Sequence, residues 1–210
     1  MKKEIRFQAN ENQIIQMILT GILEIIGTSG LQAVINLAAL PVRIVDHHTV
    51  LTGVFSIAEW KKLHDGMDSL YGRRGAQGIA IRSGQVFFKD YFRAYGVGTG
   101  MVDSEFRMLA KPKRILRGLE VLSETAVHYI PGFSVNVMQD ADHWFWCISE
   151  NAWVRENAEL CRALMRWEMG VIQEFLSWTS GGKYYPVQEM GGKGEPAGEW
   201  VIRIHKKYIE

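Results

Sequence analysis

Two short segments hold the residue types that most often bind metal ions. They are Asp46-His47-His48 and Asp140-Ala141-Asp142-His143, in which imidazole and carboxylate groups lie close together. Both fall where loops or turns are expected, and aspartate in such places usually accepts hydrogen bonds from the backbone of the turn. We therefore interpret both as turn chemistry and predict no metal site. His128 and His143 could bind a haem by residue type, but no surrounding motif supports that role.

Motifs that bind nucleotide cofactors or activate a nucleophile are absent from the sequence. There is no phosphate-binding Gly-x-x-x-x-Gly-Lys, no dinucleotide fingerprint between a strand and a helix, and no Gly-x-Ser-x-Gly. The run Gly96–Gly100 follows an expected helix, so we interpret it as a loop. Without interleaved aromatic residues, the small basic group is better explained as a solvated helix face than as a nucleic-acid site. That group is Lys111, Lys113, Arg114 and Arg117. A binding domain without a cofactor is favoured over an enzyme.

The composition is that of an ordinary soluble domain. With 210 residues, 47% apolar and 22% charged, the chain is long enough to bury a core and is expected to form a single domain, residues 1–210. Its net charge of +1 gives no field that would attract nucleic acid or a membrane. The polar start indicates no signal peptide and no apolar run approaches a membrane span, so a cytoplasmic location is expected. Seven tryptophans and nine methionines suggest bulky, adaptable packing around a cavity.

One long helix near the C-terminus should organise the fold. From Leu160 to Trp178 the apolar residues repeat with helical spacing and form one broad face. Ser180-Gly181-Gly182 should end this helix, and two extended stretches follow at Tyr184–Met190 and Glu199–Lys207. Glu168 lies inside the apolar face, where a carboxylate needs a partner. It is either an internal hydrogen-bonding group or a polar anchor in a ligand cavity.

The N-terminal part is expected to be mainly helical. A helix over Asn12–Ile26 is apolar around most of its circumference, which indicates a place at the centre of the core or contact with a second subunit. Residues 10–55 are therefore expected to act as a dimerisation or core extension. A break at Gly27–Gly30 should separate this helix from one over Leu31–Leu40, and Val42–Gly53 is expected to be an irregular connection.

The clearest helix start in the chain is the capping box Ser56-Ile57-Ala58-Glu59. Phe55 and Trp60 are placed to form the accompanying hydrophobic staple. This helix should close at Gly72, and a further helix is expected over about Gly75–Tyr95.

Gly84 interrupts the apolar face of that further helix. Glycine inside a helix costs about 1 kcal/mol relative to alanine. We therefore expect Gly84 to make room for another backbone or for a ligand.

The strands are expected in two hairpins. Ser134–Met138 and Trp144–Ser149 form the first, and the two C-terminal stretches form the second. The predicted fold class is α+β, with N-terminal helices packed with an antiparallel sheet of about four strands and the long C-terminal helix between the two hairpins.

Several of these residues resemble one known family. The run from Cys161 through Gly170 to Trp178-Thr179-Ser180-Gly181-Gly182-Lys183-Tyr184-Tyr185-Pro186-Val187-Gln188-Glu189 resembles the closing half of the 4-vinyl reductase, or hydrocarbon-binding, domain. Gly194-Glu195-Pro196-Ala197-Gly198-Glu199-Trp200 is similar to its Gly-Asp-Pro-x-Cys-x-Phe ending, and Leu70-Tyr71-Gly72-Arg73-Arg74-Gly75 to its middle. The resemblance covers most of the chain. It implies a fold shared with transport-particle (TRAPP) subunits and related to haem nitric-oxide-binding domains, a dimer, and a cavity for a small apolar molecule between helices and sheet.

The sequence departs from the zinc-bearing relatives, which hold the metal with cysteines around the last hairpin. Gly191 or Gly192 stands near the first hairpin cysteine and Gly198 at the second. Cys161 and Glu189 survive, but two candidate ligands do not make a closed tetrahedral site, so we predict no structural zinc. Packing must then hold the hairpin, through Trp200, Ile202 and Tyr185.

The leading hypothesis is non-enzymatic binding or sensing of a small hydrophobic molecule by a homodimer. A reductase would need a hydride or electron donor, and no cofactor motif is visible, so no catalytic residue is predicted. Two alternatives stay open: a scaffold or assembly module like the transport-particle subunits, and a reductase-type accessory protein acting on a tetrapyrrole. The expected ligand-binding residues supply apolar walls, space or a polar anchor. They are Gly84, Phe88, Tyr91, Trp144, Trp146, Trp167, Glu168 and Phe175.

Overall fold

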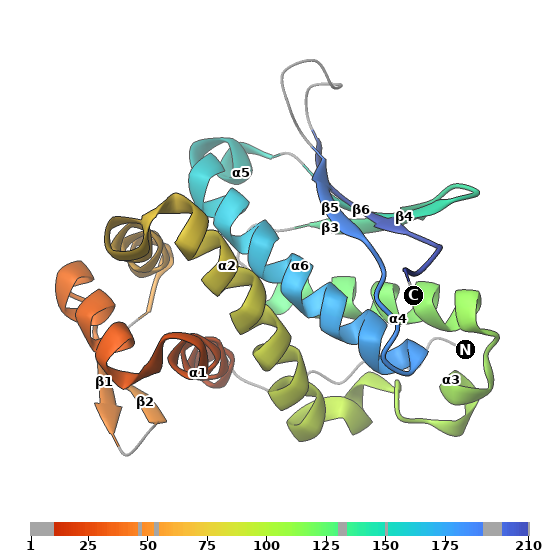
Figure 1. Ribbon diagram of the computed structural model, residues 1–210, viewed down its shortest axis with the longest axis horizontal. Coiled ribbons are helices and arrows are strands. Elements are labelled where there is room, and N and C mark those ends of the chain that lie inside the picture. The colour runs from red at the N-terminus through yellow and green to blue at the C-terminus, as the bar shows by residue number, and fades with distance from the viewer. Residues whose placement is uncertain are drawn as a thin grey trace. The chain divides into compact units, whose positions relative to one another are not determined.

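The computed structural model describes residues 11–45, 48–52, 55–129, 134–149, 151–190 and 199–209. They form an α+β fold in which helices predominate and one antiparallel sheet has four strands, which confirms the predicted fold class (Figure 1). The chain forms two compact units. Of the described residues, the helical unit contains those within 11–90 and Asn157–Val171, and the sheet unit contains those within Tyr91–Glu156 and Ile172–Glu210.

The helical unit begins with a long helix that turns sharply part-way along. Helix α1 (Glu11–Ala38) has a non-helical residue at Gly27, where φ is 72°. A positive φ is accessible to glycine without steric cost, so the predicted break falls at this residue. Ile18, Leu19 and Ile22 are completely or almost completely buried within the unit. These side chains therefore lie in the core of the unit, as the first of the two explanations predicts, and contact of this region with a second subunit stays a prediction.

Helix α1 also has the length and composition of a membrane-spanning helix, a property that the sequence analysis missed. An 18-residue window within Gln13–Ala38 has a mean hydropathy of 1.7. A straight span requires about 20 consecutive apolar residues. The break at Gly27 leaves neither part that long, and many of the apolar side chains pack inside the helical unit. These features are typical of a core helix.

A small hairpin follows α1 where an irregular connection was expected, so that prediction was wrong. Strands β1 (Val42–Val45) and β2 (His48–Leu51) pair antiparallel, with Val42 opposite Leu51. The residues of both strands are largely β-branched, which favours extended backbone. The signal was too short to recognise, because each strand has only four residues. Both strands pack against α1.

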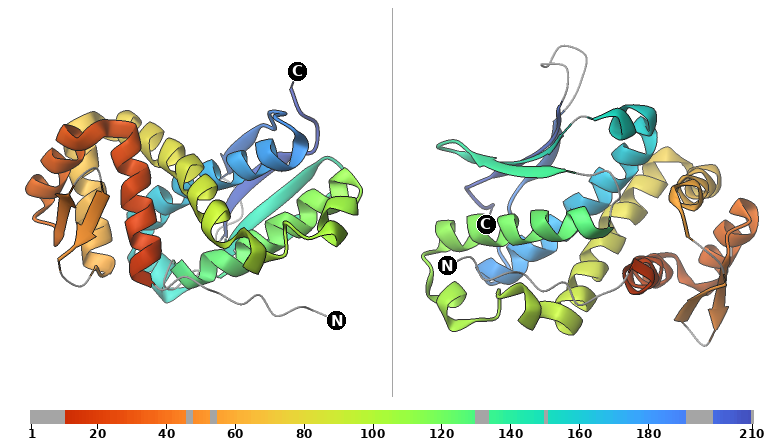
Figure 2. Two further views of the ribbon diagram at one scale, coloured as in Figure 1. Left: turned by 90° about the horizontal axis from the view of Figure 1, so that it is seen from below. Right: turned by 180° about the vertical axis from the view of Figure 1, so that it is seen from behind.

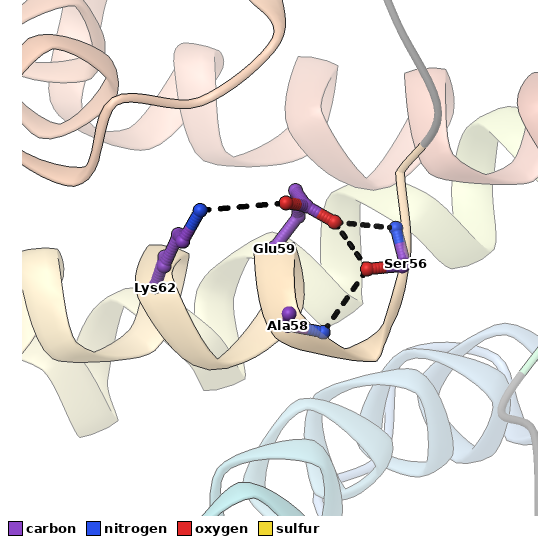
Figure 3. A network of polar contacts seen from close by, with 4 residues as sticks. All are labelled: Ser56, Ala58, Glu59 and Lys62. Atoms are coloured by element: carbon purple, nitrogen blue, oxygen red, sulfur yellow. Dashed lines mark hydrogen bonds and ion pairs between the residues drawn. The ribbon is translucent and has the colours of Figure 1, made fainter.

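Helix α2 (Ile57–Thr99) starts at the predicted capping box (Figure 3). Ser56 N–H donates to Glu59 Oε2 at 3.0 Å, and Ala58 N–H donates to Ser56 Oγ at 3.2 Å. The rings of Phe55 and Trp60 meet edge to face with their centroids 5.2 Å apart, which confirms the hydrophobic staple. Together these contacts satisfy backbone donors that the first helical turn would otherwise leave unpaired.

The predicted break at Gly72 is also present, and the chain returns at once to helix. Gly72 has φ 70° and ψ 159° inside α2. The end of α2 differs from expectation, because the helix continues through most of the glycine-rich run to Thr99. The hydroxyl of Thr99 donates to the carbonyl of Gly96 at 2.6 Å, so this run forms a helix end instead of a free loop.

Glycines allow three helices of the helical unit to approach very closely. A Cβ built at Gly84 of α2 would lie 2.1 Å from the carbonyl oxygen of Trp167 in α6 (Ala158–Ser180). From the opposite side, a Cβ at Gly170 would lie 1.8 Å from the carbonyl oxygen of Ile81. In α1, a Cβ at Gly21 would meet the carbonyl oxygen of Ser83 at 2.8 Å. Backbone therefore packs on backbone here, and that is the first of the two roles expected of Gly84.

The sheet unit combines the four-stranded sheet with shorter helices (Figure 2). The strand order is β3-β4-β6-β5, and all neighbours are antiparallel. Both predicted hairpins are present, with the second one built around β5 and β6. The elements are α3 (Ser104–Met108), α4 (Lys111–Tyr129), β3 (Val135–Gln139), β4 (His143–Ser149), α5 (Ala152–Glu156), β5 (Val187–Met190) and β6 (Glu199–His205), besides the ends of α2 and α6.

One face of this sheet forms the core of the sheet unit. On β4, Trp144, Trp146 and Ile148 alternate with residues of the opposite face and are buried, as the period of two along a strand requires. Ile202 and Ile204 continue this face on β6 and are fully buried. Helix α4 contacts β3 and β4, so it covers part of the sheet.

Candidate functional site

The helical unit contains a small cavity between its helices. Ile18 and Ile22 contribute from α1, Leu63 from α2, and Leu164 and Trp167 from α6. Helical spacing places these side chains on the inner faces of their helices. The non-helical residues Gly27 and Gly72 interrupt α1 and α2. The cavity is lined mainly by aliphatic and aromatic groups, as binding sites for apolar molecules usually are.

Polar side chains also reach this cavity, and they come from two different helices. His64 and Gln77 belong to α2, and Arg166 belongs to α6. In the amide orientation that satisfies both groups, Gln77 Oε1 accepts from Arg166 Nη1 at 3.0 Å and from Nη2 at 3.2 Å. His64 Nε2 lies 3.8 Å from Asp68 Oδ2, one helical turn further along α2. All three polar residues are half-buried, so they form a polar edge beside the apolar walls.

The size of the cavity limits what it can hold. Its volume is about 40 Å³. A single water needs about 10–15 Å³ of such space, so the cavity has room for about three or four groups of that size. A few carbon atoms fit, whereas a drug-sized molecule does not.

The predicted ligand-binding residues of the helical unit have different surroundings. Trp167 lines the cavity, and its ring meets that of Phe87 with centroids 4.6 Å apart. Gly84 faces the backbone of α6, as described above. Phe88 and Glu168 are both buried, and Glu168 is completely so. The expectation that Glu168 lies inside the apolar face is therefore confirmed, while its role as a ligand anchor stays a prediction.

The other predicted residues belong to the sheet unit. Tyr91 is buried, and this burial raises the pKa of its phenol to about 12. Phe175 packs against α4, where a Cβ at Gly118 would lie 2.1 Å from the Phe175 ring. Trp144 and Trp146 are buried on the sheet, and neither indole N–H donates a hydrogen bond to any residue that the structure describes. A ligand pocket lined by these residues stays a prediction.

Sequence reasoning missed most of the residues that line the cavity in the helical unit. Trp60 was assigned to the staple alone and also reaches the cavity, and Arg166 was not among the predicted site residues. The helical repeat of apolar residues on α2 and α6 shows which side chains point inward. It does not show where those side chains leave space unfilled.

The two cysteines are unsuited to nucleophilic or metal chemistry as they stand. Both thiols are buried, and burial raises the pKa of Cys161 to about 12. Among the residues that the structure describes, no three of histidine, cysteine, aspartate and glutamate gather into a possible metal site. The glycines Gly191, Gly192 and Gly198, on which the prediction of no zinc depends, lie outside the described residues. Of the three residues expected to hold this hairpin, Tyr185 and Ile202 are buried.

At the first predicted metal-like segment, Asp46 and His47 lie outside the described residues. At the second, the expected turn chemistry is confirmed. Asp140 Oδ1 accepts from the N–H groups of Asp142 at 2.8 Å and His143 at 2.7 Å. The His143 ring lies 4.6 Å from the His205 ring on β6, where the hairpin meets the next strand.

No protein family model matches the sequence, and no curated protein matches it. Solved structures do match over nearly the whole chain. A mutant H-NOX protein from T. tengcongensis is 11% identical, with 95% of this chain and 100% of that chain covered and a TM-score of 0.61. The Fe(II) unliganded H-NOX protein from K. algicida is 11% identical, with 91% and 96% covered and a TM-score of 0.56.

This protein resembles H-NOX proteins in fold. A further match comes from work on haem distortion in the H-NOX family, at 12% identity, 95% and 97% coverage and a TM-score of 0.61. The relation to haem nitric-oxide-binding domains, which the family resemblance implied, is thus confirmed at the level of fold.

A haem does not fit the cavity of the helical unit. Pockets for drug-sized ligands have volumes of about 300–1,000 Å³, and this cavity has about 40 Å³. His64 is the histidine at its edge, and its Nε2 is directed toward Asp68 at 3.8 Å. His143 lies in the sheet unit, on the hairpin described above.

Proposed function

We propose that this chain binds a small hydrophobic molecule in the cavity of its helical unit and acts as a sensor without catalysis. The observation that carries the proposal is a cavity of about 40 Å³ whose walls are mainly apolar side chains of three helices. An apolar guest that covers these walls removes their apolar surface from water, which is favourable. The likeness in fold to H-NOX proteins, one of them studied for its haem, supports a ligand-binding role.

The chemistry of the lining also supports binding rather than catalysis. Ser83 is the hydroxyl residue at the cavity, and its Oγ donates to the carbonyl oxygen of Ala80 at 2.9 Å. Activation of a serine needs a base that accepts this proton, and a backbone carbonyl is not such a base. The nearby thiol of Cys161 is held neutral because burial raises its pKa to about 12.

We further propose that the protein works as a homodimer and is a member of the 4-vinyl reductase family. The dimer would use residues 10–55, in which Leu37 is 59% exposed and Val45 is 45% exposed. A second copy that covers these two apolar groups would remove them from water. Native mass spectrometry of the protein as purified reports subunit number and any retained ligand in one measurement, and a monomer at micromolar concentration would exclude the dimer.

Thermal shift with a panel of small apolar molecules tests the binding proposal. The decisive variant is Ala163→Leu, because Ala163 lines the cavity on α6 and a leucine there fills about three more methyl-sized positions. The matched control is Ala94→Leu, at an exposed position of α2 in the sheet unit. We expect ligands of three to five heavy atoms to stabilise the wild-type protein and the control, and to have no effect on Ala163→Leu. Equal shifts in all three proteins, or none in the wild type, would remove the cavity as the site.

A further inference from the structure

We propose that the start of helix α4 is a binding site for a phosphate group. The site belongs to the sheet unit, so it goes beyond the proposed function and does not depend on the cavity of the helical unit. From the sequence alone, the cations at this helix start are explained as a solvated face. Two features of the structure favour an anion site instead: the helix start has no cap, and a lysine from the segment after α6 joins the cations.

The first turn of α4 leaves backbone donors without an acceptor. The N–H groups at the start of a helix have no partner inside the helix. Arg114 N–H donates to the carbonyl of Ala110 at 2.9 Å, which places Ala110 at the N-cap. An alanine side chain cannot accept a hydrogen bond, and Pro112 has no N–H. The N–H groups of Lys111 and Lys113 therefore have no acceptor in the part of the chain that the structure describes.

The charges in this turn oppose the helix dipole. The N-terminus of a helix carries a partial positive charge, so acidic side chains stabilise it and cations do not. No acidic residue lies in the first turn of α4, whereas Lys111, Lys113 and Arg114 bring three cations to it. None of the three forms an ion pair with a described carboxylate. An anion bound at this turn would satisfy both the free N–H groups and the positive charges.

Residues far away in the sequence bring a further cation to this place. Lys183 follows the end of α6, and its Nζ lies 4.8 Å from the centroid of the Tyr208 ring. Lys111 Nζ lies 5.8 Å from the same centroid, so both ammonium groups lie on one ring. Like charges held close together repel each other, and Lys183 has no ion pair with any carboxylate of the described residues. A phosphate group would relieve this repulsion and accept hydrogen bonds from both lysines.

Two buried donors beside this turn indicate a ligand independently. Arg114 Nη2 donates to the Thr179 carbonyl at 3.0 Å and Nη1 to the Arg107 carbonyl at 3.1 Å, so Thr179 lies next to the start of α4. Thr179 is only 7% exposed, and neither its hydroxyl nor Arg114 Nε has a hydrogen-bond partner among the described residues. Buried donors without an acceptor are rare in native proteins. A phosphate group has three strong acceptor oxygens to offer such donors.

Isothermal titration calorimetry of the full chain with glycerol 3-phosphate at constant ionic strength tests the site. We expect saturable binding to the wild type and at least about 10-fold weaker binding to Lys183→Met, because a hydrogen bond between charged partners is lost. Lys61→Met is the matched control. Lys61 is an exposed lysine of α2 in the helical unit, so its loss changes the net charge equally and should leave the affinity unchanged.

Ala110→Asp separates a binding role of this turn from a merely structural one. Aspartate at the N-cap accepts a hydrogen bond from the first turn and places a negative charge in the proposed site. This variant should unfold at a higher urea concentration than the wild type and bind glycerol 3-phosphate at least about 10-fold more weakly. A stabilised variant that binds as tightly as the wild type would overturn the proposal. Absence of saturable binding to the wild type, by both the phosphate ester and the vesicles described next, would also overturn it.

Soluble phosphate esters and lipid headgroups present the same phosphate chemistry, and sedimentation with vesicles separates these two sources. Phosphatidylcholine vesicles that contain phosphatidic acid should sediment the wild type but not Lys183→Met if the source is a lipid. Binding of glycerol 3-phosphate without sedimentation identifies a soluble ester. Equal sedimentation of the wild type, Lys183→Met and Lys61→Met would show a general attraction to negative charge, and the assigned site would be wrong. None of these measurements uses the cavity, so their failure leaves the proposed function of the helical unit intact.

Discussion

The closest packing in the helical unit provides the sharpest test of the structure. Gly84 on α2 faces the backbone of α6, where an added Cβ would lie 2.1 Å from the Trp167 carbonyl oxygen and 3.0 Å from the Val171 nitrogen. Both neighbours are backbone atoms, so no side chain can rotate away. Gly84→Ala therefore forces the two helices apart.

Two opposing contributions determine how much Gly84→Ala changes the free energy of unfolding. Ordinary contact with a Cβ begins near 3.4 Å, so the Trp167 oxygen must retreat by about 1.3 Å from its present 2.1 Å. Overpacking of this kind typically costs about 1–3 kcal/mol. Alanine in place of glycine inside a helix contributes about 1 kcal/mol in the favourable direction. The retreat is large, so we expect a net loss of about 2 kcal/mol in the free energy of unfolding.

Gly78→Ala is the matched control, since Gly78 lies on the same helix. A Cβ there would meet only the end of the Arg82 side chain at 3.9 Å, an ordinary contact. This variant should gain about 0.5–1 kcal/mol from helix propensity alone.

Urea unfolding followed by circular dichroism and tryptophan fluorescence measures both variants. With a slope of about 2 kcal/mol per M, Gly84→Ala should lower the midpoint by about 1 M and Gly78→Ala should raise it slightly. If Gly84→Ala is as stable as Gly78→Ala, the close approach of α2 and α6 is wrong. Gly170→Ala, whose Cβ would lie 1.8 Å from the Ile81 carbonyl oxygen, should behave like Gly84→Ala.

Three further predictions follow from local contacts. Ser56→Ala removes the side chain that accepts from Ala58 N–H at 3.2 Å, and should cost about 1 kcal/mol in urea unfolding; no change would exclude a stabilising cap. Hydrogen bonds from the N–H groups of Asp142 and His143 hold the pKa of the Asp140 carboxyl below its usual 3.8, so its stabilising contribution is present above that pH and lost as the pH falls through the lowered value. In the Asp140→Ala variant, the free energy of unfolding should therefore decrease less steeply as the pH falls below about 4. The same pH dependence as in the wild type would contradict this. Burial raises the pKa of Cys161 to about 12, so its thiol should react slowly with a disulfide reagent at pH 8 in the folded Cys147→Ser variant. The same thiol should react at once when the variant is unfolded in urea. Rapid labelling of the folded variant would instead show an accessible thiolate.

Local signals in the sequence predicted the elements and their order well. The capping box at Ser56 and the helix breaks at Gly27 and Gly72 depend on residues a few positions apart, so their geometry follows from local chemistry. The strands of the main sheet were recognised from period-two alternation, as at Trp144 and Trp146. The fold class followed from the order of these elements.

Features that depend on residues far apart in the sequence were less accessible. The β1–β2 hairpin was missed, because its short strands pack against α1 and show no clear alternation. At Gly84, the sequence left two roles open, and the backbone of α6 took the space.

The sequence by itself determined the helices, the strands and an excess of large side chains on their inner faces, since these depend on local spacing and residue type. Only the tertiary structure decided where those side chains leave space unfilled. The cavity in the helical unit depends on how three helices with glycine contacts approach one another. Its polar edge depends on Gln77 and Arg166, which are 89 positions apart in the chain and meet only in the folded protein.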